Sequence, residues 1–524
     1  MEPSPVAPAS VAREVHFWRL CLALLVGLAC ALAGRHLPFL PDARPDAACR
    51  LLFVTGFTTS SWLFAAMPIA ATSLVPLALL PLLGVRSTAE LTRGYGDPIL
   101  WLFGGGFVLA QAVERCGLHR RLALRLVAAL GPYPRRLVLG FFLAATLVSM
   151  WINNTAVALL LVPIGAVLVQ RTQALGELPP RAMANFGAAV MCAIAYGASI
   201  GGIGTPIGTA PNAIFFAAHE PLVKAGARPV SFLLWVLAFA PFALLLTGLA
   251  SALITRFALP LPGRRLARGD ELLQEARSLP PWSPAERRTA ALFGLAVLLW
   301  MTRGDLQFGA GEVVHGWAHY LVPAGERDRF ILDGSVAVLV AILAFLIPGG
   351  TPDGRRLCDW ETARTMPFDL LLLLGGGIAM ADAFGPTGVS AAFGELMRPL
   401  IGAVHPAVLL FVLVVTITML SEIASNTAVA TLLLPILRDG AIAARIDPLV
   451  LMLPAVVAAS FGFMLPIATP PNTIVFASRR LSFGQMARAG LVVDLLAAAL
   501  LVPVLWWWAL PILGVDPGQL AGPR

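Results

Sequence analysis

Charged residues are scarce in this chain. Asp, Glu, Lys and Arg make up only 13% of its 524 residues, and 58% are hydrophobic, whereas a soluble domain carries about 25% charged residues. With a mean hydropathy of +0.82, the chain does not have water as its main solvent. Apolar stretches long enough to cross a hydrocarbon core of about 30 Å recur along the sequence and predict roughly ten to twelve spans, some of them broken.

The apolar stretches also lack the alternation of apolar and polar residues that barrel strands require. Examples are Phe17–Ala33, Phe232–Ala250, Ile331–Ile347 and Leu491–Leu510. Backbone groups in lipid must find their hydrogen-bond partners within the chain, so these spans must be helices. We therefore predict an all-α polytopic membrane protein with the lipid bilayer as its surroundings.

Groups that would support catalysis are missing as well. The six cysteines and seven histidines show no metal-ligand spacing, and no nucleophile stands with a base at membrane depth. These absences argue against an enzyme such as an intramembrane hydrolase or lipid transferase. No polar stretch is long enough to fold as an appended soluble domain, which argues against a sensor.

Acidic residues are outnumbered, with 29 of them against 37 basic residues, so the net charge is +8. This excess does not indicate nucleic-acid binding, because the basic residues lie in short loops between apolar runs. Two such segments, Arg115–Arg136 and Gly263–Arg288, are rich in arginine. The positive-inside rule places both in the cytoplasm, and we expect a multi-pass protein of the bacterial inner membrane.

Comparison of the chain with itself reveals two related halves. Three anchors recur in the same order: Gly104–Gly106 at 375–377, Asn154–Ala158 at 426–430, and Pro206–Asn212 at 466–472. Transporters often contain inverted repeats whose broken helices, in corresponding positions, form a binding site near the bilayer midplane. The repeated motifs predict this arrangement here.

The repeats suggest a division of the chain into six parts. We expect N-terminal scaffold helices over 1–95, a first inverted repeat over 96–262, a cytoplasmic loop over 263–288, scaffold helices of the second half over 289–366, a second inverted repeat over 367–514 and a C-terminal tail over 515–524. Each repeat contains a glycine-rich helix, a re-entrant hairpin with an Asn-Thr break, and a later helix broken near a Pro-Asn pair.

The Asn-Thr breaks carry the groups that an ion and an anion need. Carbonyls that end one half-helix can coordinate Na⁺, and amides that begin the next half-helix attract an anion. Asn154 and Asn426 offer an amide oxygen and two N–H donors each, and Thr155 and Thr427 add hydroxyls. Either motif alone could mark a simple helix turn, but finding both in both halves favours a binding site.

The later breaks add further groups at the same level. Pro206 and Pro466 cannot continue a helical hydrogen-bond ladder, so nearby carbonyls are free to complete a cation site. Thr209 and Thr469 can donate to a substrate carboxylate. Glu422, close to the second Asn-Thr break, either tunes a cation site or anchors the hairpin backbone, and the sequence favours neither role.

These motifs resemble those of the divalent anion/sodium symporters, which transport dicarboxylates, citrate or sulfate. The likeness covers nearly the whole chain and includes Met150–Ile152 before the first break, Ser425–Thr427, and Met464–Asn472. It implies a homodimer in which a mobile transport domain moves against a fixed scaffold domain as an elevator. It also implies two Na⁺ sites that flank one anion.

Carried over by position, the resemblance implies two ligand sets. The first Na⁺ site would use Ser149, Asn153, Asn154 and Gly208, the second Ser421, Ala424, Asn426 and Ala468, and the substrate would meet Asn154, Thr155, Thr209, Asn426, Thr427, Thr469 and Pro470. Two positions depart from the family pattern, because Asn153 replaces a usual Ser and Ala210 replaces a usual Pro. The larger amide of Asn153 should reshape the first site.

Two facing Asn-Thr motifs suit an elongated ligand with a carboxylate at each end. We therefore expect secondary active transport, with Na⁺ as the coupling ion and a small dicarboxylate such as succinate, malate or fumarate as the substrate. The alternatives on the same scaffold are a carrier of sulfate, another oxyanion or citrate, and a dicarboxylate exchanger. Proton coupling in place of Na⁺ also stays open.

Overall fold

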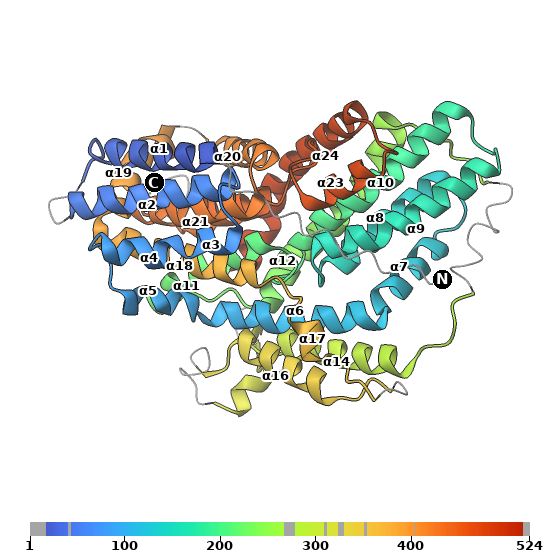
Figure 1. Ribbon diagram of the computed structural model, residues 1–524, viewed down its shortest axis with the longest axis horizontal. Coiled ribbons are helices and arrows are strands. Elements are labelled where there is room, and N and C mark those ends of the chain that lie inside the picture. Colours follow the sequence, from blue (N-terminus) through green and yellow to red (C-terminus); the bar gives the residue numbers. More distant parts are fainter. Residues whose placement is uncertain are drawn as a thin grey trace.

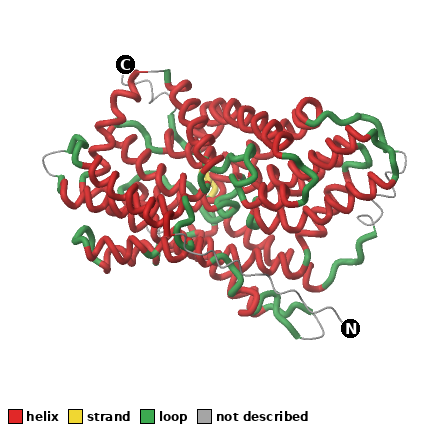
Figure 2. Tube along the Cα trace, turned by 45° about the horizontal axis from the view of Figure 1, so that its top comes forward, coloured by secondary structure: helices red, strands yellow, loops and turns green. Residues whose placement is uncertain are grey.

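The protein is a bundle of helices with a single short hairpin of strands among its described residues (Figure 2). The computed structural model describes residues 17–39, 43–266, 278–308, 312–322, 330–350, 354–403 and 405–516. Within these ranges eight helices are long and apolar enough to cross a membrane. This count falls below the expected ten to twelve because other apolar helices, such as Asp333–Leu346 and Leu449–Ala458, are too short to span alone.

The positions of prolines correspond to the ends of the N-terminal helices α3 and α4. The described part of the expected scaffold segment 1–95 begins at residue 17, and residues 1–16 lie outside the described ranges. Pro68 stands directly before α3, Pro76 is near the start of α4, and Pro81 is next to its end. The first turn of a helix tolerates proline because its N–H has no partner there, whereas Pro81 lies inside α4, one residue before its end. The helices are α1 (Phe17–Gly34), α2 (Pro45–Leu63), α3 (Ile69–Ser73), α4 (Val75–Leu82) and α5 (Thr88–Tyr95).

The first half contains seven α-helices, two of which meet at each break. The elements are α6 (Pro98–Cys116), α7 (Leu118–Ala129), α8 (Pro134–Ser149), α9 (Asn154–Ala174), α10 (Pro180–Ile203), α11 (Ala210–Lys224) and α12 (Phe232–Leu253), which η1 (Ile254–Ala258) extends. The Asn-Asn-Thr motif thus lies between α8 and α9, and the Pro206–Thr209 segment lies between α10 and α11.

The second half repeats this order after three additional α-helices, α14, α16 and the short α17. The elements are α14 (Pro284–Met301), β1 (Leu306–Phe308), β2 (Glu312–Val314), η2 (Trp317–Tyr320), α16 (Asp333–Leu346), α17 (Trp360–Ala363), α18 (Phe368–Thr387), α19 (Val389–Ala403), α20 (Pro406–Ile423), α21 (Asn426–Ala443), α22 (Leu449–Ala458), α23 (Pro470–Ala477), α24 (Phe483–Val504), η3 (Leu505–Ala509) and α25 (Leu510–Ile512). Because α14 begins at Pro284, the loop expected over 263–288 ends earlier than predicted. Residues 267–277 of that loop and 517–524 of the tail lie outside the described ranges.

The two halves pack against each other in a reciprocal way. Helix α23 of the second half contacts α9 and α10, and its counterpart α11 of the first half contacts α21 and α22. Likewise α12 packs on α8, and α24 packs on α20. In Figure 1, α8, α9 and α10 lie on the right and α19 and α21 on the left, with α12 and α24 between them. Exchange of the halves therefore reproduces these contacts.

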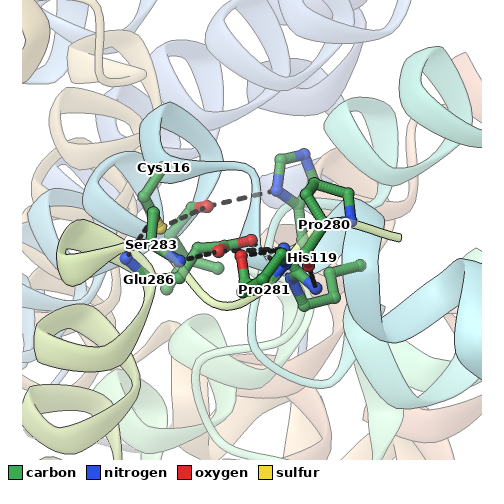
Figure 3. A network of polar contacts seen from close by, with 8 residues as sticks. Cys116, His119, Pro280, Pro281, Ser283 and Glu286 are labelled. Carbon is green, nitrogen blue, oxygen red and sulfur yellow. Dashed lines mark hydrogen bonds and ion pairs between the residues drawn. The ribbon is translucent and has the colours of Figure 1, made fainter. Parts of the chain in front are cut away.

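The two arginine-rich segments meet on one face of the protein. Arg121 of α7 binds Glu286 of α14 through Nε at 2.6 Å, and its other nitrogens donate to the carbonyls of Pro280 and Pro281. Both side chains are more than nine-tenths buried. Glu286 also accepts the Ser283 amide at 2.7 Å in a capping box (Figure 3). The segments expected in the cytoplasm thus lie together.

A second contact fastens the end of α6 on this face. Arg115 binds Asp359, the residue before α17, at 2.7 Å. The hydroxyl and amide of Thr362 donate to Asp359 and lower its pKa to about 2. The carboxylate therefore stays charged, and the ion pair persists, over the whole physiological pH range.

Removal of Arg121 should destabilise the protein more than removal of both partners. In Arg121→Ala the buried Glu286 loses its counter-charge, which typically costs about 3–5 kcal/mol. The double variant Arg121→Ala/Glu286→Gln keeps a side chain that can cap α14 without a charge. It should therefore recover much of the lost stability. Thermal unfolding of the purified variants in detergent measures the difference, and equal melting temperatures for the single and double variants would contradict the pairing.

Candidate functional site

The first break brings together four helix ends. Helix α8 ends at Ser149 and α9 begins at Asn154, while α10 ends at Ile203 and α11 begins at Ala210. Because α10 packs on both α8 and α9, the two interruptions of the backbone lie at the same level. Helix ends carry backbone groups without partners in their own helix, so this region has carbonyls and amides available.

Oxygen atoms of three expected ligands converge here. One terminal atom of the Asn154 amide lies 2.7 Å from Ser149 Oγ, 3.2 Å from the Ala198 carbonyl and 3.3 Å from the Gly208 carbonyl. If this atom is the amide nitrogen, it donates to all three. If this atom is the amide oxygen, it faces the other three oxygen atoms, and a cation bound among the four would be coordinated by them. Ser149, Asn154 and Gly208 are thus together, and Ala198 is an addition that the sequence did not indicate.

Two glycines make this approach possible. A Cβ at Gly202 would lie 2.9 Å from the Asn154 side chain and 2.9 Å from Thr209 Cβ. A Cβ at Gly208 would meet the backbone of Gly202, with its carbonyl oxygen at 2.5 Å. Real Cβ atoms avoid such distances to backbone, since packed interiors leave no room to shift. Only glycine therefore allows α10, Asn154 and the segment before α11 to meet.

The second break repeats the contact between serine and asparagine. Ser421 Oγ donates to Asn426 Oδ1 at 2.8 Å and to the Ala459 carbonyl at 2.7 Å. Ser421 is fully buried. Ser421 and Asn426 occupy the positions of Ser149 and Asn154, whereas the nearby carbonyl of Ala459 contacts the serine and that of Ala198 faces the asparagine. The expected ligand Ala468 is adjacent, because a Cβ at Gly462 would lie 3.4 Å from Ala468 Cβ and 3.6 Å from the Ser421 carbonyl.

An asparagine braces each later break. Asn212 Nδ2 donates to the carbonyls of Gly202 at 2.9 Å and Thr205 at 2.8 Å. Asn472 Nδ2 donates to the carbonyls of Gly462 and Leu465, both at 2.9 Å. Both asparagines are fully buried. Their motif was visible in the sequence, but their role as braces depends on backbone groups that the sequence does not mark.

The two later breaks are also tied to the hairpins, by different groups. In the first half the Thr205 hydroxyl donates to the Met150 carbonyl. In the second half both oxygens of the Glu422 carboxylate accept backbone amides, from Met464 at 2.7 Å and Leu465 at 2.8 Å. Of the two roles that the sequence left open for Glu422, these contacts supply the anchoring one.

Other expected site residues take positions at helix starts. Asn153 precedes α9, and its side-chain oxygen accepts the Thr155 amide at 2.8 Å, so that oxygen caps a helix. Thr209 and Thr469 precede α11 and α23, and Thr469 Oγ1 accepts the Asn472 amide at 3.3 Å. Half-buried Thr155 and Thr427 lie in the first turns of α9 and α21, Ala424 follows α20, and Pro470 begins α23.

Four helices thus begin at the two pairs of breaks, namely α9, α11, α21 and α23. The first amides of a helix carry partial positive charge and bind anions. Serine and asparagine oxygens supply partial negative charge beside them. The region can therefore hold small cations and an anion next to each other.

A family model described as the sodium:sulfate symporter transmembrane region matches residues 14–514. The chain belongs to this family. It is therefore a multi-pass membrane transporter, as the sequence predicted, and not an enzyme.

Curated relatives support this assignment. The chain is 36% identical to the sodium-dependent dicarboxylate transporter SdcS of Staphylococcus saprophyticus over 92% of this chain and 90% of that one. It is 34% identical, over the same shares, to SdcS of Staphylococcus aureus. These relatives are bacterial, in agreement with the inner membrane as its location.

Two solved structures share the fold. The YdaH transporter of Alcanivorax borkumensis matches with a TM-score of 0.54 and 19% identity over 80% of this chain and 88% of that one. MtrF of Neisseria gonorrhoeae, from a class of antimetabolite efflux pumps, matches with a TM-score of 0.58 and 12% identity over 94% of each chain. At these identities the likeness concerns the fold alone.

Substitution of Gly202 by Ala should abolish transport. The added methyl would push Asn154 away from the Gly208 carbonyl and Thr209 away from the break. Gly248→Ala in α12 is the matched control, because a Cβ there meets nothing within 4 Å. Uptake of labelled substrate by cells with equal amounts of each variant in the membrane measures the effect. Full uptake by the Gly202→Ala variant would show that the close approach is unnecessary.

Proposed function

We propose that this chain carries small dicarboxylates together with Na⁺ into the cell across the bacterial inner membrane. The observation that carries this proposal is the pair of equivalent oxygen clusters, one at Ser149 and Asn154 and one at Ser421 and Asn426. The printed names of the relatives, sodium-dependent dicarboxylate transporters, support both the ion and the substrate class.

Na⁺ suits these clusters because hard cations prefer oxygen ligands. In the first site Ser149, Asn154, Gly208 and the Ala198 carbonyl would surround the ion. In the second site Ser421, Asn426 and the Ala459 carbonyl would do so, with Ala424 and Ala468 at its edge. Asn153 would contribute to the first site by its backbone carbonyl, since its amide oxygen already caps α9.

The dicarboxylate would lie between the two Asn-Thr motifs. One carboxylate would meet Asn154, Thr155 and the start of α9, and the other would meet Asn426, Thr427 and the start of α21. Thr209, Thr469 and Pro470 would line the same space from α11 and α23. Two Na⁺ ions would offset the charge of the dianion, which explains why ion and substrate would bind together.

Sulfate transport is the second candidate, because the family model carries sulfate in its description. Citrate transport and dicarboxylate exchange use the same site in principle. A ligand with a carboxylate at each end is favoured here since the two Asn-Thr motifs are equivalent, whereas sulfate would need only one of them. Competition of labelled succinate with malate, citrate and sulfate separates these cases.

An elevator movement is supported by a difference between the halves. A Cβ at Gly106 of α6 would lie 3.9 Å from Ile207 Cβ at the first break, and Ile207 is only 8% exposed. At the corresponding positions, Gly377 of α18 faces Thr431 instead, and Ile467 is 76% exposed. The glycine-rich helix α6 thus covers the first break, whereas its counterpart α18 leaves the second break open. Movement of the hairpins and broken helices past α6 and α18 would exchange these states, with the other helices as scaffold.

The resemblance leads us to propose a homodimer as well.

Na⁺ coupling can be tested through Ser149. Ser149→Ala removes one proposed ligand, and the Na⁺ concentration for half-maximal succinate uptake should rise about tenfold, equivalent to ~1.4 kcal/mol. Ser199→Ala in α10 is the matched control, since the Ser199 hydroxyl is buried and has no hydrogen-bond partner among the described residues. The measurement is uptake into proteoliposomes with Na⁺, K⁺ or only a pH difference across the bilayer.

Asn154→Ala and Asn426→Ala should abolish coupled uptake in the same assay while the protein stays folded. Uptake of wild-type protein that proceeds equally well in K⁺ would defeat the choice of ion. Inhibition by sulfate and by none of the dicarboxylates would defeat the choice of substrate.

The elevator can be tested with a disulfide. Cysteines at 106 and 207 would place their Cβ atoms 3.9 Å apart, within the range of about 3.5–4.5 Å that disulfides use. In a background without the six native cysteines, oxidation of Gly106→Cys/Ile207→Cys should stop uptake, and reduction should restore it. The equivalent pair Gly377→Cys/Ile467→Cys should cross-link only when the second break is covered. Undiminished uptake by the oxidised first pair would contradict movement between α6 and the break.

A further inference from the structure

A group of metal-ligating side chains lies outside the breaks, in the connection between α14 and α16. Asp305 precedes β1, His315 follows β2, and His319 lies in η2. The ligand atoms of these three residues all lie within 4.8 Å of one another. The prediction that the histidines show no metal-ligand spacing is wrong for His315 and His319. These two residues are four positions apart, and the turn between them brings their side chains together.

The hairpin explains why these residues meet. Its register pairs Leu306 with Val314, so Asp305 and His315 are the next residues opposite each other. Asp305 Oδ1 accepts the Gly316 amide at 3.0 Å and fixes the carboxylate. Its Oδ2 lies 3.3 Å from His315 Nδ1 and 3.8 Å from His319 Nδ1.

The turn that carries the histidines is held firmly to α14. The Trp317 amide donates to the Thr302 carbonyl at 3.0 Å, and its indole donates to the Leu299 carbonyl at 2.9 Å. At the same end, Arg303 binds Asp333 of α16 at 2.6 Å. The donor set is therefore supported by backbone and side-chain contacts to two helices.

The distances fit a metal ion better than a pair of hydrogen bonds. His319 Nδ1 is buried and has no hydrogen-bond partner among the described residues. Zn²⁺ binds imidazole nitrogen and carboxylate oxygen at about 2.0–2.2 Å, so two ligand atoms of a tetrahedral site lie about 3.3 Å apart. The Nδ1 to Oδ2 distances of 3.3 and 3.8 Å match this spacing.

We propose that Asp305, His315 and His319 bind a divalent transition metal ion, with Zn²⁺ as the best fit. Two imidazoles select Zn²⁺ and its first-row neighbours over Mg²⁺ and Ca²⁺, which prefer oxygen. Three protein ligands leave a position open for water. Helix α14 starts beside Arg121, on the face expected in the cytoplasm, and its 18 residues extend about 27 Å. The proposed metal site therefore lies at the end of α14 away from Arg121.

Titration of the purified full-length protein with Zn²⁺, after treatment with a chelator, tests this site. Isothermal titration calorimetry should give one ion per chain with a micromolar or lower Kd. His315→Ala/His319→Ala and Asp305→Asn should each weaken binding at least tenfold. Asp305→Asn keeps an oxygen for the Gly316 amide, so it separates loss of a ligand from loss of the turn.

The matched control is His36→Ala, which removes an exposed histidine elsewhere in the chain. Its Kd should equal that of the wild type. Co²⁺ gives a second readout, because binding at this site should produce a visible absorption band that the double variant lacks. Absence of saturable Zn²⁺ binding in the wild type, or equal Zn²⁺ affinity in the wild type and the double variant, would overturn the proposal.

Discussion

The structure depends on one constraint: a backbone group in lipid must find its hydrogen-bond partner inside the protein. Continuous helices satisfy this requirement by themselves, but the chain interrupts its helices at four corresponding places. Each interruption leaves carbonyls and amides that need partners. Asn212, Asn472, Thr205 and Glu422 satisfy some of them. The carbonyls of Ala198 and Gly208 remain directed toward Asn154, and such groups are what a coordinated cation would use.

The two halves use identical side chains for some of these contacts and different side chains for another. The Ser-Asn pair and the bracing asparagine are identical in the two halves, whereas the link from hairpin to later break changes from a hydroxyl to a carboxylate. Glu422 accepts two amides, and Thr205 donates to one carbonyl. The surroundings differ too, since Ile207 is covered by α6 and Ile467 is exposed. Local equivalence combined with unequal cover is the property that alternating access requires.

The two ends of α14 show how the remaining charges are placed. Its first turn holds Glu286 against Arg121, which unites the arginine-rich segments on one face. Beyond its last turn lie Arg303 with Asp333 and the cluster around Asp305. These charged groups thus lie in pairs beyond the apolar stretch of α14, because burial of an unpaired charge in hydrocarbon is costly.

Sequence alone determined the helical class, the two related halves and the positions of all four breaks, because apolar length, proline and repeated Asn-Thr motifs act locally. It also indicated Ser149, Asn154, Ser421 and Asn426. Only tertiary structure decided that Ala198, Gly202 and Ala459 take part, since a backbone carbonyl or a missing Cβ has no sequence signature of its own. The same holds for Asp305, which the register of the hairpin brings to His315 and His319, whereas the spacing of the two histidines is visible in the sequence.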